Sequence, residues 1–137
     1  MELKKYKDKS KEYTYYLKDG EEVYHGLYKS WYEDGQINYE WNYKDGKRHG
    51  LHKGWYDNGQ INYESNYKDG KHHGLQKRWY KDGQINYEWN YKDGEQHGLS
   101  KDWYEDGQLE FEYYYWEGIK YESEEDCEDE RIANKSW

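Results

Sequence analysis

The sequence is poor in the residues that build most protein cores and cross-links. Its 137 residues include no proline and one cysteine, and only 14 of them are Leu, Ile, Val or Phe. Because Cys127 has no partner in the chain, a disulfide framework is excluded, as expected for a reducing compartment. No stretch approaches the roughly 18 apolar residues of a membrane-spanning helix, and the N-terminal residues lack the apolar run of a signal peptide. We therefore expect a soluble cytoplasmic protein.

The charge is acidic and the aliphatic content is low. With a net charge of -9, the chain lacks the basic surface that nucleic acids require. So few aliphatic residues at this charge are typical of disorder. However, 21% of the residues are aromatic, and each ring can bury roughly 150–250 Å². Because these rings also recur at fixed spacing, we predict a folded chain with a thin aromatic core.

A 24-residue repeat organises the chain. Three full copies occupy residues 31–102, a partial copy follows at 103–122, and a degenerate first copy precedes them at 13–30. Self-similarity at such a period indicates a repeat architecture, in which one unit cannot bury its apolar face alone. Residues 13–122 therefore form the predicted repeat domain. Residues 1–12 are a lysine-rich N-terminal arm, expected to be frayed. Residues 123–137 are an acidic tail that acts as a cap, ends in a short helix near Trp137, or docks on a partner.

Glycine marks two turns in each repeat. These are the predicted structural turns at Gly35, Gly46, Gly59, Gly70, Gly83, Gly94 and Gly107, most of which follow Asp and one of which follows Asn. An x-Asp-Gly triplet between strands suits a three-residue hairpin loop whose glycine adopts the left-handed conformation. We therefore predict such loops at residues 57–59 and 68–70 and at the equivalent positions.

Apolar and polar residues alternate between the turns, as in Gln60–Tyr67, which indicates strands with one buried face. With three-residue loops, odd positions pair with odd positions. One face then carries Leu51, Trp55, Ile61, Tyr63, Tyr67, Leu75 and Trp79. The other carries Gln60, Asn62, Glu64, Asn66, Gln76 and Arg78, together with Tyr56 and Tyr80. The predicted fold is all-β, an elongated single-layer antiparallel β-meander of hairpin repeats with about ten strands.

A histidine and a glycine also recur in phase. The histidines are His25, His49, His73 and His97. Equivalent residues two strands apart are separated by roughly 9–10 Å, too far to share one zinc ion, so we predict no metal site and no cofactor. Each histidine is expected to pair across a turn with an aromatic ring or a backbone carbonyl. For Gly50, Gly74 and Gly98, we expect a ring of the next strand to lie over the bare Cα.

Carboxylates recur in a row as well, at Glu40, Glu64, Glu88 and Glu112. Their spacing could match that of glycosidase carboxylates by chance. Since no cleft or pKa-raising environment is evident around them, a solvated ladder is the better interpretation, and we predict no catalytic residues.

Aromatic rows are the best candidates for binding. The rows are Trp31, Trp55, Trp79 and Trp103; Tyr39, Tyr63, Tyr87 and Phe111; and Tyr43, Tyr67, Tyr91 and Tyr115. Trp41 and Trp89 flank Ser65, where a further row is interrupted. These rings can simply be the core, or part of the surface can bind a partner, since Tyr and Trp dominate binding hot spots. The predicted contact residues are the Trp31 row and, on the polar face, Tyr32, Tyr56, Tyr80 and Tyr104.

The repeated motif resembles a known family. The run Tyr-Lys-Asp-Gly-Lys-x-His-Gly-Leu-x-x-x-Trp-Tyr-x-Asp/Asn-Gly-Gln-Ile is similar to MORN repeats, above all to the bacterial, antitoxin-like variant, and covers residues 18–118. The resemblance implies an extended sheet of β-hairpins without catalytic chemistry that serves as a scaffold or interaction platform.

We therefore expect a non-enzymatic protein–protein binding platform, in the manner of an antitoxin or immunity protein that blocks a partner, with acidic residues facing a basic partner. One alternative is a membrane-associated MORN scaffold, which the negative charge disfavours. Another is an aromatic-rich carbohydrate- or choline-binding module. A homodimer is compatible with each interpretation.

Overall fold

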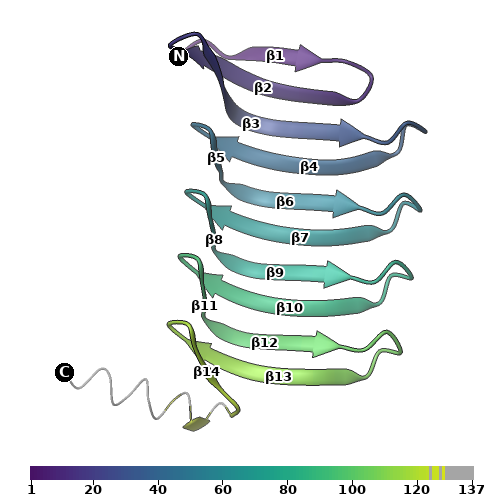
Figure 1. Cartoon of the computed structure of the whole chain (residues 1–137), viewed down its shortest axis with the longest axis vertical. Coiled ribbons are helices and arrows are strands. Elements are labelled where there is room, and N and C mark those ends of the chain that lie inside the picture. The colour runs from purple at the N-terminus through teal and green to yellow at the C-terminus, as the bar shows by residue number, and fades with distance from the viewer. Residues whose placement is uncertain (124, 127, 129–137) are drawn as a thin grey trace, which may run out of the picture.

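The chain forms one antiparallel sheet. The computed structural model describes residues 1–123, 125, 126 and 128 and contains fourteen strands. They are β1 (Lys4–Lys7), β2 (Lys11–Lys18), β3 (Glu21–Trp31), β4 (Ile37–Lys44), β5 (Lys47–Arg48), β6 (Gly50–Trp55), β7 (Ile61–Lys68), β8 (Lys71–His72), β9 (Gly74–Trp79), β10 (Ile85–Lys92), β11 (Glu95–Gln96), β12 (Gly98–Trp103), β13 (Leu109–Trp116) and β14 (Ile119–Tyr121). Eleven strands follow one another across the sheet in chain order, while the two-residue strands β5, β8 and β11 pair with β4, β7 and β10. Figure 1 shows this single layer, with β1 at one end and β14 at the other.

This architecture confirms the predicted all-β antiparallel meander of hairpin repeats. The expected number of about ten strands is close to the eleven of the main path. Each full repeat supplies a strand of eight residues, such as β7, and a strand of six residues, such as β9. Glycine-containing turns separate these strands at both edges of the sheet. Each six-residue strand ends on the first residue of the next copy, as β6 does at Trp55.

The three-residue loop is confirmed at residues 57–59. Trp55 pairs with Ile61 across the loop, and the Gly59 N–H donates to the Tyr56 carbonyl at 3.0 Å. Gly59 has a φ of 85°, the left-handed conformation that closes this type of loop. The same backbone bond recurs at Gly35, Gly83 and Gly107. These loops line the edge of the sheet drawn on the right in Figure 1.

The second loop is shorter than predicted. Lys68 pairs with Lys71, so the turn contains two residues, Asp69 and Gly70, rather than three. Both have positive φ, 50° and 85°, as the type I′ turn of a tight hairpin requires. Asp tolerates this conformation better than most residues do, which is why the Asp-Gly pair suits a two-residue turn as well as a three-residue loop.

The predicted division of side chains between the two faces is wrong, because each hairpin around a three-residue loop contains a bulge. Gly54 pairs with Tyr63, but the next pair is Trp55 with Ile61, so Asn62 is an extra residue on β7. The bulge shifts the register by one, and Leu51 pairs with Asn66.

The bulge separates the aromatic rows. One face, called here the aromatic face, carries His52, Tyr63, Ser65, Tyr67 and their equivalents in other repeats. The opposite mixed face carries Leu51, Lys53, Trp55, Glu64, Asn66 and their equivalents. The Trp31 row therefore lies on the other side of the sheet from the Tyr39 and Tyr43 rows.

The glycine of each His-Gly pair has a conformational role. Gly74 has a φ of 92°, and a Cβ added there would meet the Asn66 Cβ at 3.7 Å, so no ring covers it. The expectation of a ring over Gly50, Gly74 and Gly98 is therefore wrong. A ring does lie over Gly54, where an added Cβ would collide with the Tyr63 side chain.

The N-terminal residues belong to the sheet instead of forming a frayed arm. β1 pairs with β2, and the Tyr6 ring stacks on Tyr13 with centroids 5.0 Å apart. In the connecting turn, Asp8 Oδ1 accepts the N–H groups of Ser10 at 2.8 Å and Lys11 at 2.9 Å, and these bonds lower the pKa of Asp8 to about 2. The side chains of β1 are exposed. At the other end, the tail at 123–137, where a short helix near Trp137 was one of the expectations, lies almost entirely outside the described residues.

A single layer buries few side chains. Among the described residues, Tyr13, at 6% exposure, is the one buried hydrophobic residue. Most other rings are half-buried and contact each other, as Tyr13 and Tyr28 do with centroids 5.0 Å apart. Within the described part of the chain, no helix has the length and hydropathy needed to cross a membrane.

Candidate binding surface on the aromatic face

The repeated histidines connect successive repeats. His49 Nδ1 accepts the backbone N–H of Asp69 at 3.3 Å, and the neighbouring Gly70 N–H donates to the Arg48 carbonyl at 2.8 Å. Equivalent Nδ1 bonds are made by His25, His73 and His97 to residues 45, 93 and 117. Each histidine thus holds the two-residue turn one repeat ahead. The Nδ1 partner is a backbone amide rather than the predicted carbonyl. The other predicted partner, an aromatic ring, is present at His25, whose ring lies 6.0 Å from that of Tyr16 between centroids. His97 also lies against the Trp116 ring, with centroids 4.5 Å apart.

Three of the tyrosines predicted to contact a partner connect repeats at the opposite edge. Tyr56 Oη donates to the Trp79 carbonyl at 2.7 Å, and Tyr32 and Tyr80 make the same bond to Trp55 and Trp103. Tyr104 is different, since its side chain is 49% exposed and no further full repeat follows. The hydroxyls of the first three have a structural role, whereas binding by this row and by the Trp31 row remains a prediction.

One variable position on the aromatic face is buried in every full repeat. It carries His52, Gln76 and Ser100, each at most 3% exposed. His52 Nε2 donates to the Asn42 carbonyl at 2.7 Å, and Gln76 Nε2 makes the equivalent bond to Asn66 at 2.8 Å. Burial lowers the pKa of His52 to about 4, so the ring is neutral at pH 7. The sequence analysis missed this position. Its signal is that it changes between copies that are otherwise nearly identical.

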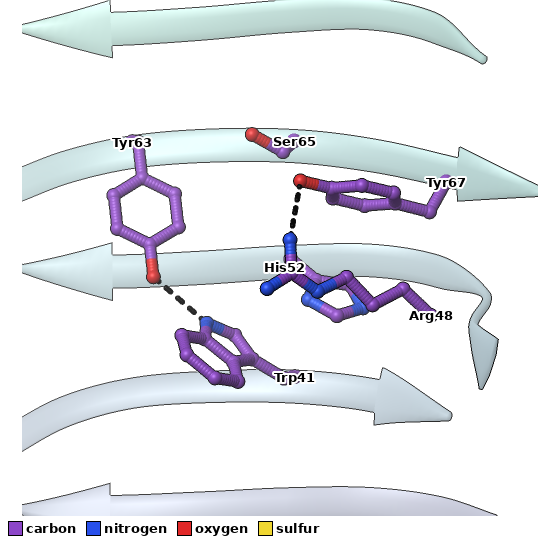
Figure 2. Close-up of a pocket in the computed structure, with 6 residues that line it drawn as sticks. All are labelled: Trp41, Arg48, His52, Tyr63, Ser65 and Tyr67. Carbon is purple, nitrogen blue, oxygen red and sulfur yellow. Dashed lines mark hydrogen bonds between the residues drawn. The ribbon is translucent and has the colours of Figure 1, made fainter. Parts of the chain in front are cut away.

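A gap interrupts the aromatic face at Ser65. In the neighbouring repeats a tryptophan occupies this position and stacks on the tyrosine two residues earlier. The centroids are 4.0 Å apart for Tyr39 and Trp41 and 3.9 Å apart for Tyr87 and Trp89. Ser65 provides no ring. Tyr63 instead lies over Gly54 and accepts a hydrogen bond from Trp41 Nε1 at 2.7 Å (Figure 2).

The gap is an open cavity of about 170 Å³ lined by Trp41, Arg48, His52, Tyr63, Ser65 and Tyr67. Its one cation is Arg48, whose guanidinium lies 5.8 Å from the Trp41 ring and 5.4 Å from the Tyr67 ring and donates to Tyr67 Oη at 3.1 Å. In Figure 2 these side chains come from three adjacent strands and the β5 segment. An aromatic surface with one arginine is suited to bind rings and polar groups rather than to carry out a reaction.

Comparison with known protein families identifies the repeat. The model of the MORN repeat variant matches residues 24–45, 48–69, 73–93 and 96–117, which together make up more than half of the chain. The chain belongs to the MORN repeat variant family. Each of the four MORN segments covers one hairpin around a three-residue loop, namely β3–β4, β6–β7, β9–β10 and β12–β13, and all four fall within residues 18–118, where the sequence motif occurs. No curated protein matches the chain.

The recurring glutamates of the MORN repeats lie on the mixed face and are paired. Lys29, Lys53 and Lys77 approach Glu40, Glu64 and Glu88, each with an N···O distance of 3.9 Å. These pairs are partly exposed, so each contributes little to stability. Among the described residues, no group of three or more His, Cys, Asp or Glu side chains is arranged to hold a metal ion.

Acidic side chains gather along the three-residue loops of the MORN repeats. The exposed acids there are Glu33, Asp34, Asp57, Asp82, Glu105 and Asp106. Asp34, Asp82 and Asp106 each accept the N–H of the glutamine two residues later, which stabilises the loop. Lys81 is the one basic residue in these four loops, and it pairs with Asp57 at 3.0 Å. This acidic loop edge therefore presents a negative surface beside the sheet.

Proposed function

We propose that this MORN protein is a non-enzymatic platform that binds another protein in the cytoplasm and thereby blocks it, as an antitoxin or immunity protein does. The observation that carries the proposal is the aromatic face, whose rings are half-buried and, in the described part of the chain, have no second layer over them. A contiguous exposed surface of this kind marks an interaction site. The antitoxin-like role itself rests on the resemblance of the motif.

The acidic loop edge indicates the charge of the partner. Its six acids face solvent with one lysine among them, so a basic protein surface would be attracted to this edge. The aromatic face adjoins the loop edge along the whole array. For a partner that contacts both surfaces, the acidic loop edge would increase the rate of association and the aromatic rings would supply most of the affinity.

A charge-reversal variant tests this proposal. We expect the wild-type chain, immobilised and exposed to lysate of its native host, to retain a basic protein. The triple variant Glu33→Lys, Asp57→Lys and Glu105→Lys should lose that protein. These side chains are exposed and make no backbone bond that closes a loop, so the fold should persist.

The matched control reverses charges on the opposite edge, at Lys44, Lys68 and Lys92, which are also exposed. This control should retain the same protein. Capture of one protein by all three baits, or recovery of lipid or carbohydrate without any protein, would contradict the proposed function.

A further inference from the structure

The neighbouring repeats show what occupies the position of Ser65 when the aromatic row is complete. At the equivalent positions Trp41 and Trp89 each stack on a tyrosine, with interplanar angles of 19° and 15°. Tyr63 has no stacked ring among the described residues. The gap thus lies in a row of stacked aromatic pairs and lacks one indole.

The groups around the gap are left with unused bonding capacity. Ser65 Oγ makes no hydrogen bond to any described residue. Arg48 has no carboxylate within ion-pair distance in the described part of the chain, although the protein is strongly acidic. The hydroxyl can accept an indole or phenol proton, and the guanidinium can extend its stacking to a further ring.

We propose that this gap receives the aromatic side chain of a residue of the partner protein, which takes the place of the missing indole. The inference rests on the proposed function and assigns its anchor point. A cavity of about 150 Å³ is enough to bind benzene, and the gap measures about 170 Å³, so one ring fits. A ring bound there would lie against Arg48 and Tyr67 and complete the aromatic row, as hot-spot residues do in central pockets.

An anion is the less suitable occupant. Arg48 already donates to Tyr67 and lies over the Trp41 and Tyr67 rings, so part of its bonding capacity is in use. Tyr63 Oη already accepts a hydrogen bond from the Trp41 Nε1–H group. A carboxylate would therefore meet a single cation that already has other partners, whereas an aromatic ring could pack against Trp41, His52 and Tyr67.

Titration with a small aromatic probe tests the inference without knowledge of the partner. Adding N-acetyl-tryptophanamide to the full chain should shift the backbone NMR signals of residues 48, 52, 65 and 67 in a saturable manner. Ser65→Trp, which introduces the indole found at positions 41 and 89, should raise the dissociation constant of the probe by at least about tenfold. Ser65→Ala keeps the gap open and should still bind. N-acetyl-leucinamide and sodium acetate should produce no saturable shift.

Several results would overturn the inference. These are a wild-type chain without saturable shifts, equal binding by Ser65→Trp, and equal binding of the leucine or acetate probes. The capture experiment distinguishes this failure from failure of the proposed function. If wild type and Ser65→Trp retain a partner protein equally, the gap is not the anchor point but the proposed function still holds. If no protein partner is retained at all, the proposed function itself is contradicted.

Discussion

Single residues hold each repeat to the next through bonds that recur along the array. At one edge of the sheet, the histidine Nδ1 accepts a hydrogen bond from a backbone N–H of the next turn. At the other edge, a tyrosine hydroxyl donates a hydrogen bond to the carbonyl of a tryptophan in the next repeat. Most domains are stabilised by hydrophobic contacts between layers of secondary structure. In this single sheet, the two kinds of hydrogen bond connect the repeats instead. Because Tyr13 is the one buried hydrophobic side chain in the described part of the sheet, we expect these polar bonds to contribute substantially to its stability.

Tyr56→Phe tests the hydroxyl bond at residue scale. The variant keeps the ring but removes the bond to the Trp79 carbonyl, so we expect the free energy of unfolding to fall by about 1 kcal/mol. The control is Tyr104→Phe, because Tyr104 is exposed in the last repeat and should show almost no change. Urea unfolding followed by tryptophan fluorescence measures both, and equal effects would show that the hydroxyl bond contributes nothing.

His52 should make the stability depend on pH. Burial lowers the pKa of His52 from 6.5 to about 4. Between these pH values the histidine is therefore protonated in the unfolded chain but neutral in the folded chain. The full stability is therefore present above pH 6.5, and the free energy of unfolding falls by about 3 kcal/mol as the pH decreases to 4. Urea unfolding at pH 7 and pH 4 measures this loss.

His52→Gln is the matched variant, because Gln76 makes the same bond to the equivalent carbonyl. We expect it to remain folded at pH 7 and to lose less stability than the wild type on acidification. A pH dependence identical to that of the wild type would show that the other histidines and carboxylates account for the effect.

At the scale of the elements, irregularities set the register of the sheet. Each repeat contains a bulge after its three-residue loop and a glycine of positive φ as the first residue of its six-residue strand. These features decide which residues share a face, since one extra residue moves every following side chain to the opposite side.

Gly74→Ala tests the second irregularity. Gly74 has a φ of 92°, and an L-residue with a Cβ pays about 1–2 kcal/mol in the left-handed region. We expect a loss of this size in the free energy of unfolding, while Ser65→Ala, in a regular part of β7, should cost less than half as much. Equal losses in the two variants would mean that the backbone conformation at Gly74 is not strained for alanine.

The elements could be predicted from the sequence, but their register could not. Alternation from Gln60 to Tyr67 and the Asp-Gly pairs are local signals, and they locate the strands and turns of the full repeats, although the second turn is one residue shorter than predicted. An Asp-Gly pair fits both a three-residue loop and a type I′ turn, and the bulge at Asn62 leaves the alternation of its own strand intact. The faces were therefore misassigned. The gap at Ser65 is visible in the sequence as an interrupted aromatic row. Arg48, which lines the gap, belongs to the preceding copy of the repeat, and the sequence alone does not predict that it lies beside Ser65.

The whole molecule behaves as a linear array in which each repeat contacts its neighbours. Stability should then be the sum of similar units and their interfaces. Deletion of residues 55–78 removes one period and joins Gly54 to Trp79 in the same phase. We expect cooperative urea unfolding with a smaller m-value, since m scales with the surface exposed on unfolding. The control deletion of residues 61–72 removes half a period, breaks the register and should abolish cooperative unfolding. Similar unfolding curves for both deletions would contradict the array.

The register of the hairpin is the central claim, because it places the aromatic face, the gap and the connections between repeats. NOE spectroscopy of the isotopically labelled chain measures it directly. The account predicts contacts between the Gly54 Hα protons and the Tyr63 ring and backbone contacts that pair Leu51 with Asn66. Backbone contacts that pair Leu51 with Ser65, as an unbulged hairpin requires, would contradict it.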